Sequence, residues 1–155
     1  MEIERKFLVN ERINDIDLSQ YEKEEISQFY LFRSPEFRVR KCNNKYYATY
    51  KTNGGLEREE KETKVNSAFY NNYKMLKNGY EISKTRYKIP LTEGLIAEVD
   101  FYHNYLEGLK VVEIEFESIE QANNFNDFPV FFDKEITNDL RYKNKNLSKV
   151  KRIPK

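Results

Sequence analysis

The sequence predicts a mainly β fold of the α+β type, an eight-stranded antiparallel β-barrel that forms a tunnel with a charged lumen and carries a few short covering helices. Two observations predict it. Apolar and polar residues alternate with period two in eight segments, most of them separated by short turn signals rich in Asn and Gly. The polar faces of most of these segments also carry charged side chains at regular spacing. Closing such strands into a barrel removes exposed sheet edges.

The elements are expected in this order along the chain. Strands are predicted near residues 2–9, 25–33, 36–42, 45–52, 56–65, 80–89, 94–103 and 110–117. Residues 66–77 open with Asn66, a good helix N-cap, and place Phe69, Tyr73 and Leu76 at helical intervals, which predicts a helix. Short helices are also predicted over 118–126 and 139–150. Asn53-Gly54-Gly55 is typical of a hairpin turn, because no Gly-Lys-Ser/Thr helix start follows it.

Charged residues share one face of each strand, because side chains two residues apart point to the same side. In the first strand Glu2, Glu4 and Lys6 share a face, and Ile3 and Phe7 lie on the other. The carboxylates placed in this way are Glu2, Glu4, Glu60, Glu62, Glu98, Asp100, Glu113 and Glu115. The cations are Lys6, Arg38, Arg40, Lys51, Arg58, Lys84 and Arg86.

These charged faces have two interpretations. Each one, taken alone, is typical of a solvated sheet surface, since charged residues are mostly exposed. However, few small apolar residues remain to fill a barrel interior, so we expect the apolar faces to pack outward and the charges to line the lumen. Buried charges are costly unless they pair or bind something. Arg and Lys side chains suit phosphates, and Mg²⁺ prefers one or two carboxylates plus phosphate oxygens, so the set predicts a metal-complexed polyphosphate as ligand.

Composition excludes several other classes of protein. The 155 residues fit a single domain, 1–155. The 27 Lys+Arg and 26 Asp+Glu residues give a net charge of +1, which argues against a general nucleic-acid binder. No run approaches the roughly 18 apolar residues of a membrane-spanning helix. The single Cys42 excludes an internal disulfide framework. We therefore expect a cytoplasmic monomer or homodimer with a small-molecule partner and no nucleic-acid or membrane partner.

An ordered set of motifs resembles the CYTH superfamily, the triphosphate tunnel metalloenzymes. The opening EIERKFLV contains Glu2-x-Glu4-x-Lys6, similar to the ExExK signature of that family. The remaining matches follow in order over nearly the whole chain: FRVR (37–40), TYK (49–51), REEKE (58–62), KTRY (84–87), EVD (98–100), EIEF (113–116) and TNDLRYKNKNLS (137–148). The resemblance implies an eight-stranded tunnel that binds triphosphate with Mg²⁺ or Mn²⁺, with two ions expected. The chain looks most like the small bacterial inorganic triphosphatases.

The resemblance also implies roles for individual residues. The metal-ligand candidates are Glu2, Glu4, Glu113 and Glu115, with Asp100 or Glu98 and Glu60 or Glu62 as helpers. The phosphate-binding candidates are Lys6, Arg38, Arg40, Lys51, Arg58, Lys84 and Arg86. Lys6, Glu4, Arg40 and Tyr30 are the catalytic candidates. Tyr30 lies in SQFYLF, where relatives often have Gln-Gly-Tyr-Leu, and a packed tyrosine is the competing interpretation of this residue.

The expected reaction is metal-dependent hydrolysis of inorganic triphosphate to pyrophosphate and phosphate. The alternatives are a class IV-type adenylate cyclase, a thiamine or nucleoside triphosphatase, and a non-catalytic polyphosphate-binding module. Cyclase relatives often carry an early His-Phe element, but the only histidine here is His103. We expect no essential role for His103, and inert packing for Cys42.

Overall fold

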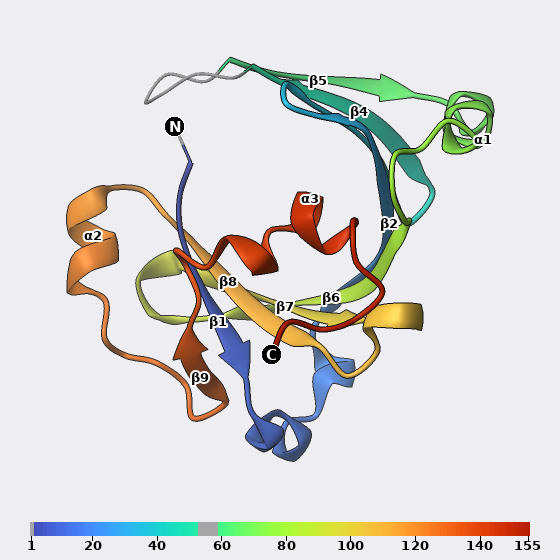
Figure 1. Ribbon diagram of the computed structural model, residues 1–155. Coiled ribbons are helices and arrows are strands. Elements are labelled where there is room, and N and C mark those ends of the chain that lie inside the picture. Colours follow the sequence, from blue (N-terminus) through green and yellow to red (C-terminus); the bar gives the residue numbers. More distant parts are fainter. Residues whose placement is uncertain (1, 53–58) are drawn as a thin grey trace.

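The computed structural model describes residues 2–52 and 59–155, and their strands form one antiparallel sheet (Figure 1). Its nine strands, counted over these residues, are arranged in the order β5-β4-β3-β2-β6-β7-β8-β1-β9. The strands are β1 (Ile3–Val9), β2 (Glu22–Arg33), β3 (Glu36–Cys42), β4 (Lys45–Lys51), β5 (Glu60–Val65), β6 (Ile82–Pro90), β7 (Ile96–Tyr102), β8 (Lys110–Phe116) and β9 (Phe132–Glu135).

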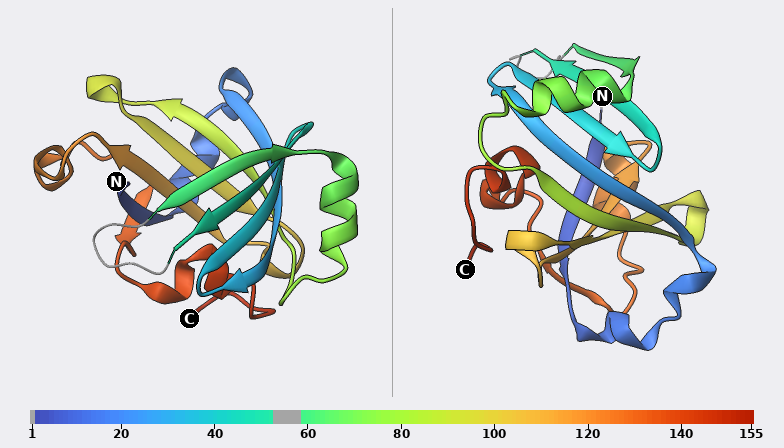
Figure 2. Two further views of the ribbon diagram at one scale, coloured as in Figure 1. Left: turned by 90° about the horizontal axis from the view of Figure 1, so that it is seen from above. Right: turned by 90° about the vertical axis from the view of Figure 1, so that its right-hand side faces the viewer.

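The sheet curls around one axis, as the view from above in Figure 2 shows. Backbone hydrogen bonds do not join its two outer strands, β5 and β9, in the described part of the chain. Side chains approach across the gap instead: the Lys51 ammonium at the end of β4 lies 3.9 Å from a Glu2 carboxylate oxygen, just before β1. The expected barrel is therefore a curled sheet rather than a hydrogen-bonded cylinder.

The ninth strand, β9, was missed by the sequence analysis. It is four residues long, and within the described ranges it pairs with β1 alone, through Phe7–Glu135 and Val9–Phe132. Four residues give too short an alternation to recognise, so only the long-range pairing defines this strand. The other strands agree with expectation apart from their ends, and β2 begins at Glu22, three residues early. The predicted turn at 53–55 and part of the predicted strand at 56–65 lie outside the described residues.

Two of the three predicted helices form, with the caps that the sequence indicated. In α1 (Ser67–Lys74) the Asn66 side chain accepts a hydrogen bond from the Phe69 N–H at 2.8 Å. In α2 (Ile119–Asn124) the Ser118 hydroxyl does the same for Gln121 at 3.0 Å. The third prediction, 139–150, was wrong in length. That stretch divides into a 3₁₀ turn, η5 (Leu140–Tyr142), and a short helix, α3 (Asn144–Leu147).

The predicted apolar face of α1 also needs correction. Tyr70 is its buried residue and packs on Phe29 of β2, with ring centroids 5.0 Å apart. Tyr73 and Leu76, predicted for the same face as Phe69, are 40% and 68% exposed. Leu76 lies beyond the end of the helix, so helical spacing does not apply to it.

Four 3₁₀ turns complete the described structure besides η5, and most of the core lies outside the curl of the sheet. The turns are η1 (Glu11–Asp15), η2 (Leu18–Gln20), η3 (Thr92–Gly94) and η4 (Asn104–Leu106). Val99 and Val112 pack with Ile13 of η1 and with Phe131 before β9. Ile114 packs under Ala122 of α2, and Phe29 packs under α1. These apolar faces point outward, as predicted. A further apolar cluster, which includes Ile82, Val111 and Leu147, lies on the concave side, where the C-terminal segment packs against the sheet. No helix within the described ranges has the length and apolar character needed to cross a membrane.

Candidate active site

The concave side of the sheet encloses a cavity of about 410 Å³ that is lined almost entirely by polar side chains. Strands β1, β2, β3, β4, β6, β7 and β8 contribute to its wall, together with a segment near the C-terminus. The predicted site residues that line it are Glu2, Glu4, Lys6, Tyr30, Arg38, Arg40, Lys51, Arg86, Glu98, Glu113 and Glu115. Glu4 and Arg40 therefore face the same space, which confirms the inward direction of the charges.

Carboxylates gather on one wall because of the register of β1, β7 and β8. Glu4 lies opposite Glu115, and Glu113 lies between Lys6 on β1 and Glu98 on β7. The side chains of Glu4 and Glu113 are neighbours on this wall and influence each other's ionisation. The neighbouring Glu113, together with burial, raises the pKa of Glu4 well above its usual range. Although burial opposes the ionisation of Glu113, the neighbouring Glu4 and Lys6 lower its pKa.

Arginines form the facing wall. Arg38 and Arg40 project from β3, and the Arg40 Nε donates to the Gln28 side-chain oxygen at 3.0 Å. Burial lowers the pKa of Arg40 to about 10, and the neighbouring Arg38 and Arg86 add to that effect. The Arg38 Nε is buried without a hydrogen-bond partner in the described structure. Arginine forks suit phosphate oxygens, so these two guanidinium groups fit a bound polyphosphate.

A buried ionic cluster joins β6 and β7 on the concave face of the sheet. Lys84 is fully buried, and its ammonium lies 2.8 Å from the carboxylate of Asp100, which is 3% exposed. Arg86 binds both oxygens of Asp100, at 2.8 and 3.0 Å, and reaches Glu98 at 3.2 Å. Burial lowers the pKa of Lys84 to about 8 in spite of Asp100. Burial alone would raise the pKa of Asp100, but the neighbouring Lys84 and Arg86 outweigh this effect and lower it.

The structure thus places Lys84 and Asp100 differently from the other predicted site residues. They contact each other and Arg86, and neither is among the described residues that line the cavity. Their position indicates that they hold the Arg86 guanidinium in place. A direct role of Lys84 in substrate binding or of Asp100 in metal binding stays a prediction.

Tyr30 reaches the cavity from β2 and is 2% exposed. Its hydroxyl accepts a hydrogen bond from the Gln28 amide at 3.2 Å. Burial raises the pKa of Tyr30 to about 12, so the phenol keeps its proton at neutral pH. In this environment the hydroxyl group suits donation to a phosphate oxygen better than removal of a proton from water.

The remaining predicted residues lie near the edge of the sheet. Lys51 lines the cavity and lies 4.0 Å from Glu60 of β5. Glu62 accepts a hydrogen bond from the Thr49 hydroxyl at 3.2 Å. Glu60 and Glu62 are exposed, and neither is among the described residues that line the cavity. Arg58, a predicted phosphate ligand, lies outside the described residues.

The sequence analysis missed five polar residues at the site. Gln28 bridges Arg40 and Tyr30, and Glu36 lies 3.9 Å from Arg38. Both could have been found by spacing, because Gln28 shares a face with Tyr30, and Glu36 shares one with Arg38. Lys143, Asn144 and Lys145 also line the cavity. They follow no strand alternation, and only the return of the C-terminal segment brings them to the site.

The donor set fits a hard divalent cation, although it is not a preformed cage. In the described part of the chain, no three His, Cys, Asp or Glu side chains converge on a single point. Mg²⁺ normally takes one or two protein carboxylates and completes its shell with water and phosphate oxygens, so convergence of three is not required. Glu4 and Glu113 offer such ligands once both are ionised.

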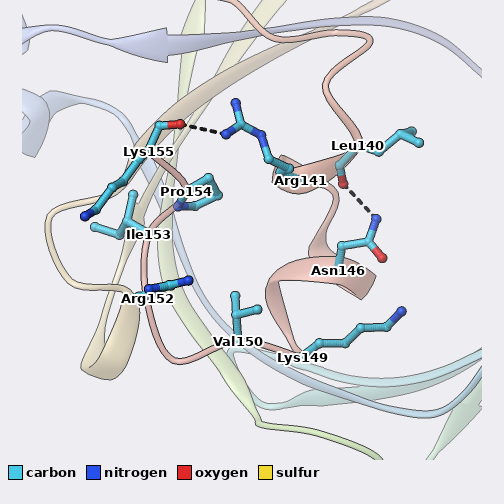
Figure 3. A pocket seen from close by; sticks show the side chains of 9 residues that line it. All are labelled: Leu140, Arg141, Asn146, Lys149, Val150, Arg152, Ile153, Pro154 and Lys155. Carbon is cyan, nitrogen blue, oxygen red and sulfur yellow. Dashed lines mark hydrogen bonds between the residues drawn. The ribbon is translucent and has the colours of Figure 1, made fainter.

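Other candidates lie outside this cavity. The His103 ring nitrogen is 2.7 Å from the Thr85 hydroxyl on the outer side of the sheet. Burial and Glu24 raise the pKa of the Cys42 thiol to about 11, which fits the predicted inert packing. A second hollow of about 630 Å³ lies between α3 and the C-terminal tail, where Arg141 donates to the Lys155 carbonyl (Figure 3). It contains none of the predicted site residues.

Comparison with known proteins agrees with this geometry. The CYTH domain family matches residues 1–150. The chain is 37% identical to an inorganic triphosphatase of Nitrosomonas europaea over 150 residues, 95% of this chain and 96% of the relative. It is 35% identical to an inorganic triphosphatase of Acetivibrio thermocellus, over 96% of this chain and 93% of the relative.

The fold is also similar to a solved structure. A crystal structure of an inorganic triphosphatase superposes with a TM-score of 0.74 at 32% identity, covering 100% of this chain and 97% of that one. The charged cavity, the match over residues 1–150 and the full-length relatives lead to one assignment. The chain belongs to the CYTH domain family.

Proposed function

We propose that this protein hydrolyses inorganic triphosphate to pyrophosphate and phosphate with the help of a divalent cation, Mg²⁺ or Mn²⁺. The observation that carries the proposal is the division of one cavity into a carboxylate wall and an arginine wall. Two full-length relatives named inorganic triphosphatase support it. A cytoplasmic location, as monomer or homodimer, is part of the proposal, and the single cysteine supports the location.

The two walls divide the work of the reaction. Phosphoryl transfer depends on positioning and on neutralising charge rather than on covalent chemistry by the protein. Arg38, Arg40 and Arg86 bind phosphate oxygens, and Tyr30 donates a further hydrogen bond. Glu2, Glu4, Glu113 and Glu115 hold the cation, with two ions expected. When bound, the cation polarises the phosphate and lowers the pKa of an attacking water.

A phosphate-release assay tests the proposal directly. We expect turnover of triphosphate with Mg²⁺ or Mn²⁺, loss of turnover with excess chelator, and much slower release from ATP and pyrophosphate. Excess Ca²⁺ should inhibit, because it tolerates irregular coordination and occupies the site without enforcing the reactive geometry. Faster conversion of ATP to cyclic AMP, or faster thiamine triphosphate hydrolysis, would replace the proposal. Binding of triphosphate without turnover would indicate a non-catalytic module.

Substitution of Lys6 distinguishes a catalytic role of this residue from a structural one. Its ammonium lies 3.8 Å from Glu113 and 3.4 Å from the Tyr142 carbonyl, beside the carboxylate wall. We expect Lys6→Met to lower kcat about a hundredfold, on the order of 3 kcal/mol of transition-state stabilisation. The melting temperature should stay close to that of the wild type. Steady-state kinetics and thermal melts measure both quantities.

Lys23 provides the matched control for this substitution. It forms an ion pair with Glu25, also at 3.8 Å, on the outer side of the same sheet. Lys23→Met should therefore leave kcat unchanged. A decrease in kcat of less than about threefold for Lys6→Met, with a clear loss of stability, would make Lys6 a structural ion-pair partner only.

A further inference from the structure

A segment near the C-terminus forms part of the cavity wall. This closing segment, residues 140–148, contains η5 and α3 and crosses the concave side of the sheet between β1 and β2 (Figures 1 and 2). Its residues Lys143, Asn144 and Lys145 line the cavity. The Asn144 side chain also accepts a hydrogen bond of 2.6 Å from the hydroxyl of Tyr102, the last residue of β7.

Apolar packing holds the closing segment against the sheet at two points. Tyr142 and Leu147 are buried among Ile82, Leu109 and Val111. Such packing is non-directional, so it holds the segment near the sheet without setting the orientation of the polar side chains between these two anchors. The Tyr102 hydroxyl orients Asn144 itself, and a further contact fixes the backbone that carries its neighbours.

Arg33 at the end of β2 makes that contact. Its Nε donates to the Lys145 carbonyl at 2.8 Å, and one terminal nitrogen donates to the Ser148 hydroxyl at 2.9 Å. The guanidinium also binds Asn78 through its side-chain oxygen at 2.8 Å and its carbonyl at 2.6 Å. A rigid planar fork with several donors fixes relative orientation in a way that a flexible ammonium does not.

The turn before β6 completes the contact from the other side. The Tyr80 N–H donates to the Ser148 carbonyl at 2.7 Å. Gly79, next to it, has φ +96° and lies so close that an added methyl group would overlap the Ser148 carbonyl and the Arg33 guanidinium. This position thus requires glycine for both its backbone angle and its close approach.

We propose that Arg33 is a positioning residue, which acts with Asn78 and Gly79 as a latch that orients the closing segment and so places Lys143, Asn144 and Lys145 for binding of the triphosphate. The proposal rests on the proposed function for the identity of the ligand. Arg33 itself does not line the described cavity, so it acts through the segment rather than on the substrate.

Two substitutions test the latch from its two sides. Arg33→Gln removes the fork, and Gly79→Ala displaces Ser148 without altering any charge. We expect each to raise the KM for triphosphate about tenfold, with kcat within about threefold, because ground-state binding is weakened while the metal wall stays intact. Amide exchange should accelerate in residues 140–148 but not in β6–β8. Arg33→Lys should restore only part of the affinity, since one ammonium cannot replace the fork.

The chain offers a control for each variant. Gly94 also has a positive φ, +72°, but an added methyl group there meets nothing within 4 Å. Arg12 is an exposed arginine in an ion pair with Asp15. Gly94→Ala and Arg12→Gln should keep the wild-type KM and the wild-type exchange in residues 140–148.

Two outcomes would overturn the latch. One is a KM for Arg33→Gln and Gly79→Ala equal to that of the controls. The other is faster exchange across the whole chain, which would make Arg33 a general stability residue. If the wild type hydrolyses no triphosphate, the proposed function fails, and exchange in residues 140–148 together with calorimetric triphosphate binding still decides the latch.

Discussion

Glu113→Gln is expected to lower kcat/KM for triphosphate by at least about a hundredfold. Glu113 occupies the centre of the carboxylate wall, opposite Lys6 on β1 and Glu98 on β7. Glutamine keeps the shape but removes the charge that holds the cation, and metal-based charge stabilisation is worth several kcal/mol, with about 1.4 kcal/mol for each factor of ten. Steady-state phosphate release at several Mg²⁺ and Mn²⁺ concentrations measures the loss.

The fold should survive this change. The introduced glutamine is neutral, so it removes the unfavourable interaction between two neighbouring carboxylates that raises the pKa of Glu4 in the wild type. Thermal melts without metal should therefore show an unchanged or raised midpoint. Glu115→Gln should change activity in the same direction, whereas Glu120→Gln, on the exposed face of α2, should have no effect. Near-wild-type rates in both Glu113→Gln and Glu115→Gln would assign the metal to a different wall.

Asp100→Asn should cost about 3–5 kcal/mol of folding stability at neutral pH, the usual effect of removing one partner from a buried ion pair. Asp100 is 3% exposed and binds both Lys84 and Arg86. Its replacement leaves the fully buried Lys84 ammonium without a counter-charge. Urea denaturation at constant pH measures the change in the free energy of unfolding.

The stability deficit should also depend on pH. Burial already lowers the pKa of Lys84 to about 8, so Lys84 loses its proton at a lower pH in the folded chain than in the unfolded chain. Between the folded and unfolded pKa values the unfolded chain binds more protons, and stability therefore rises with pH. Loss of Asp100 enlarges this interval. The deficit should shrink as the pH is raised from 7 to about 9 and then level off, because Lys84 is neutral in the folded state of both proteins above its wild-type pKa.

Two further variants interpret this result. Asp15→Asn removes the partner of Arg12 in an exposed ion pair, where solvent screens the charges, and should hardly move the midpoint. Lys84→Met combined with Asp100→Asn should recover part of the loss, since it removes the unpaired ammonium. An Asp100→Asn variant as stable as the wild type would show that Arg86 and Lys84 need no common partner.

The sequence by itself determined eight of the nine described strands and most of the charged residues of the two walls. Strict alternation in EIERKFLV or EIEF assigns Glu4 and Glu113 to a face from the chain alone, because side chains two residues apart always share a side of a strand. Caps at Asn66 and Ser118 are equally local. The same alternation, with its apolar residues on the opposite faces, predicted the inward direction of the charges.

Only the tertiary structure decided the contacts that depend on strand register and on how distant segments of the chain pack against the sheet. Three contacts join residues that are distant in sequence. They are the pairing of β9 with β1, the interaction of Glu4 with Glu113, and the burial of Lys84 with Asp100. Alternation gives the side of a strand but not the depth of a side chain or its partner on the next strand. The closing segment shows this most clearly: Arg33 meets Lys145 across 112 positions, and no local pattern encodes such a contact.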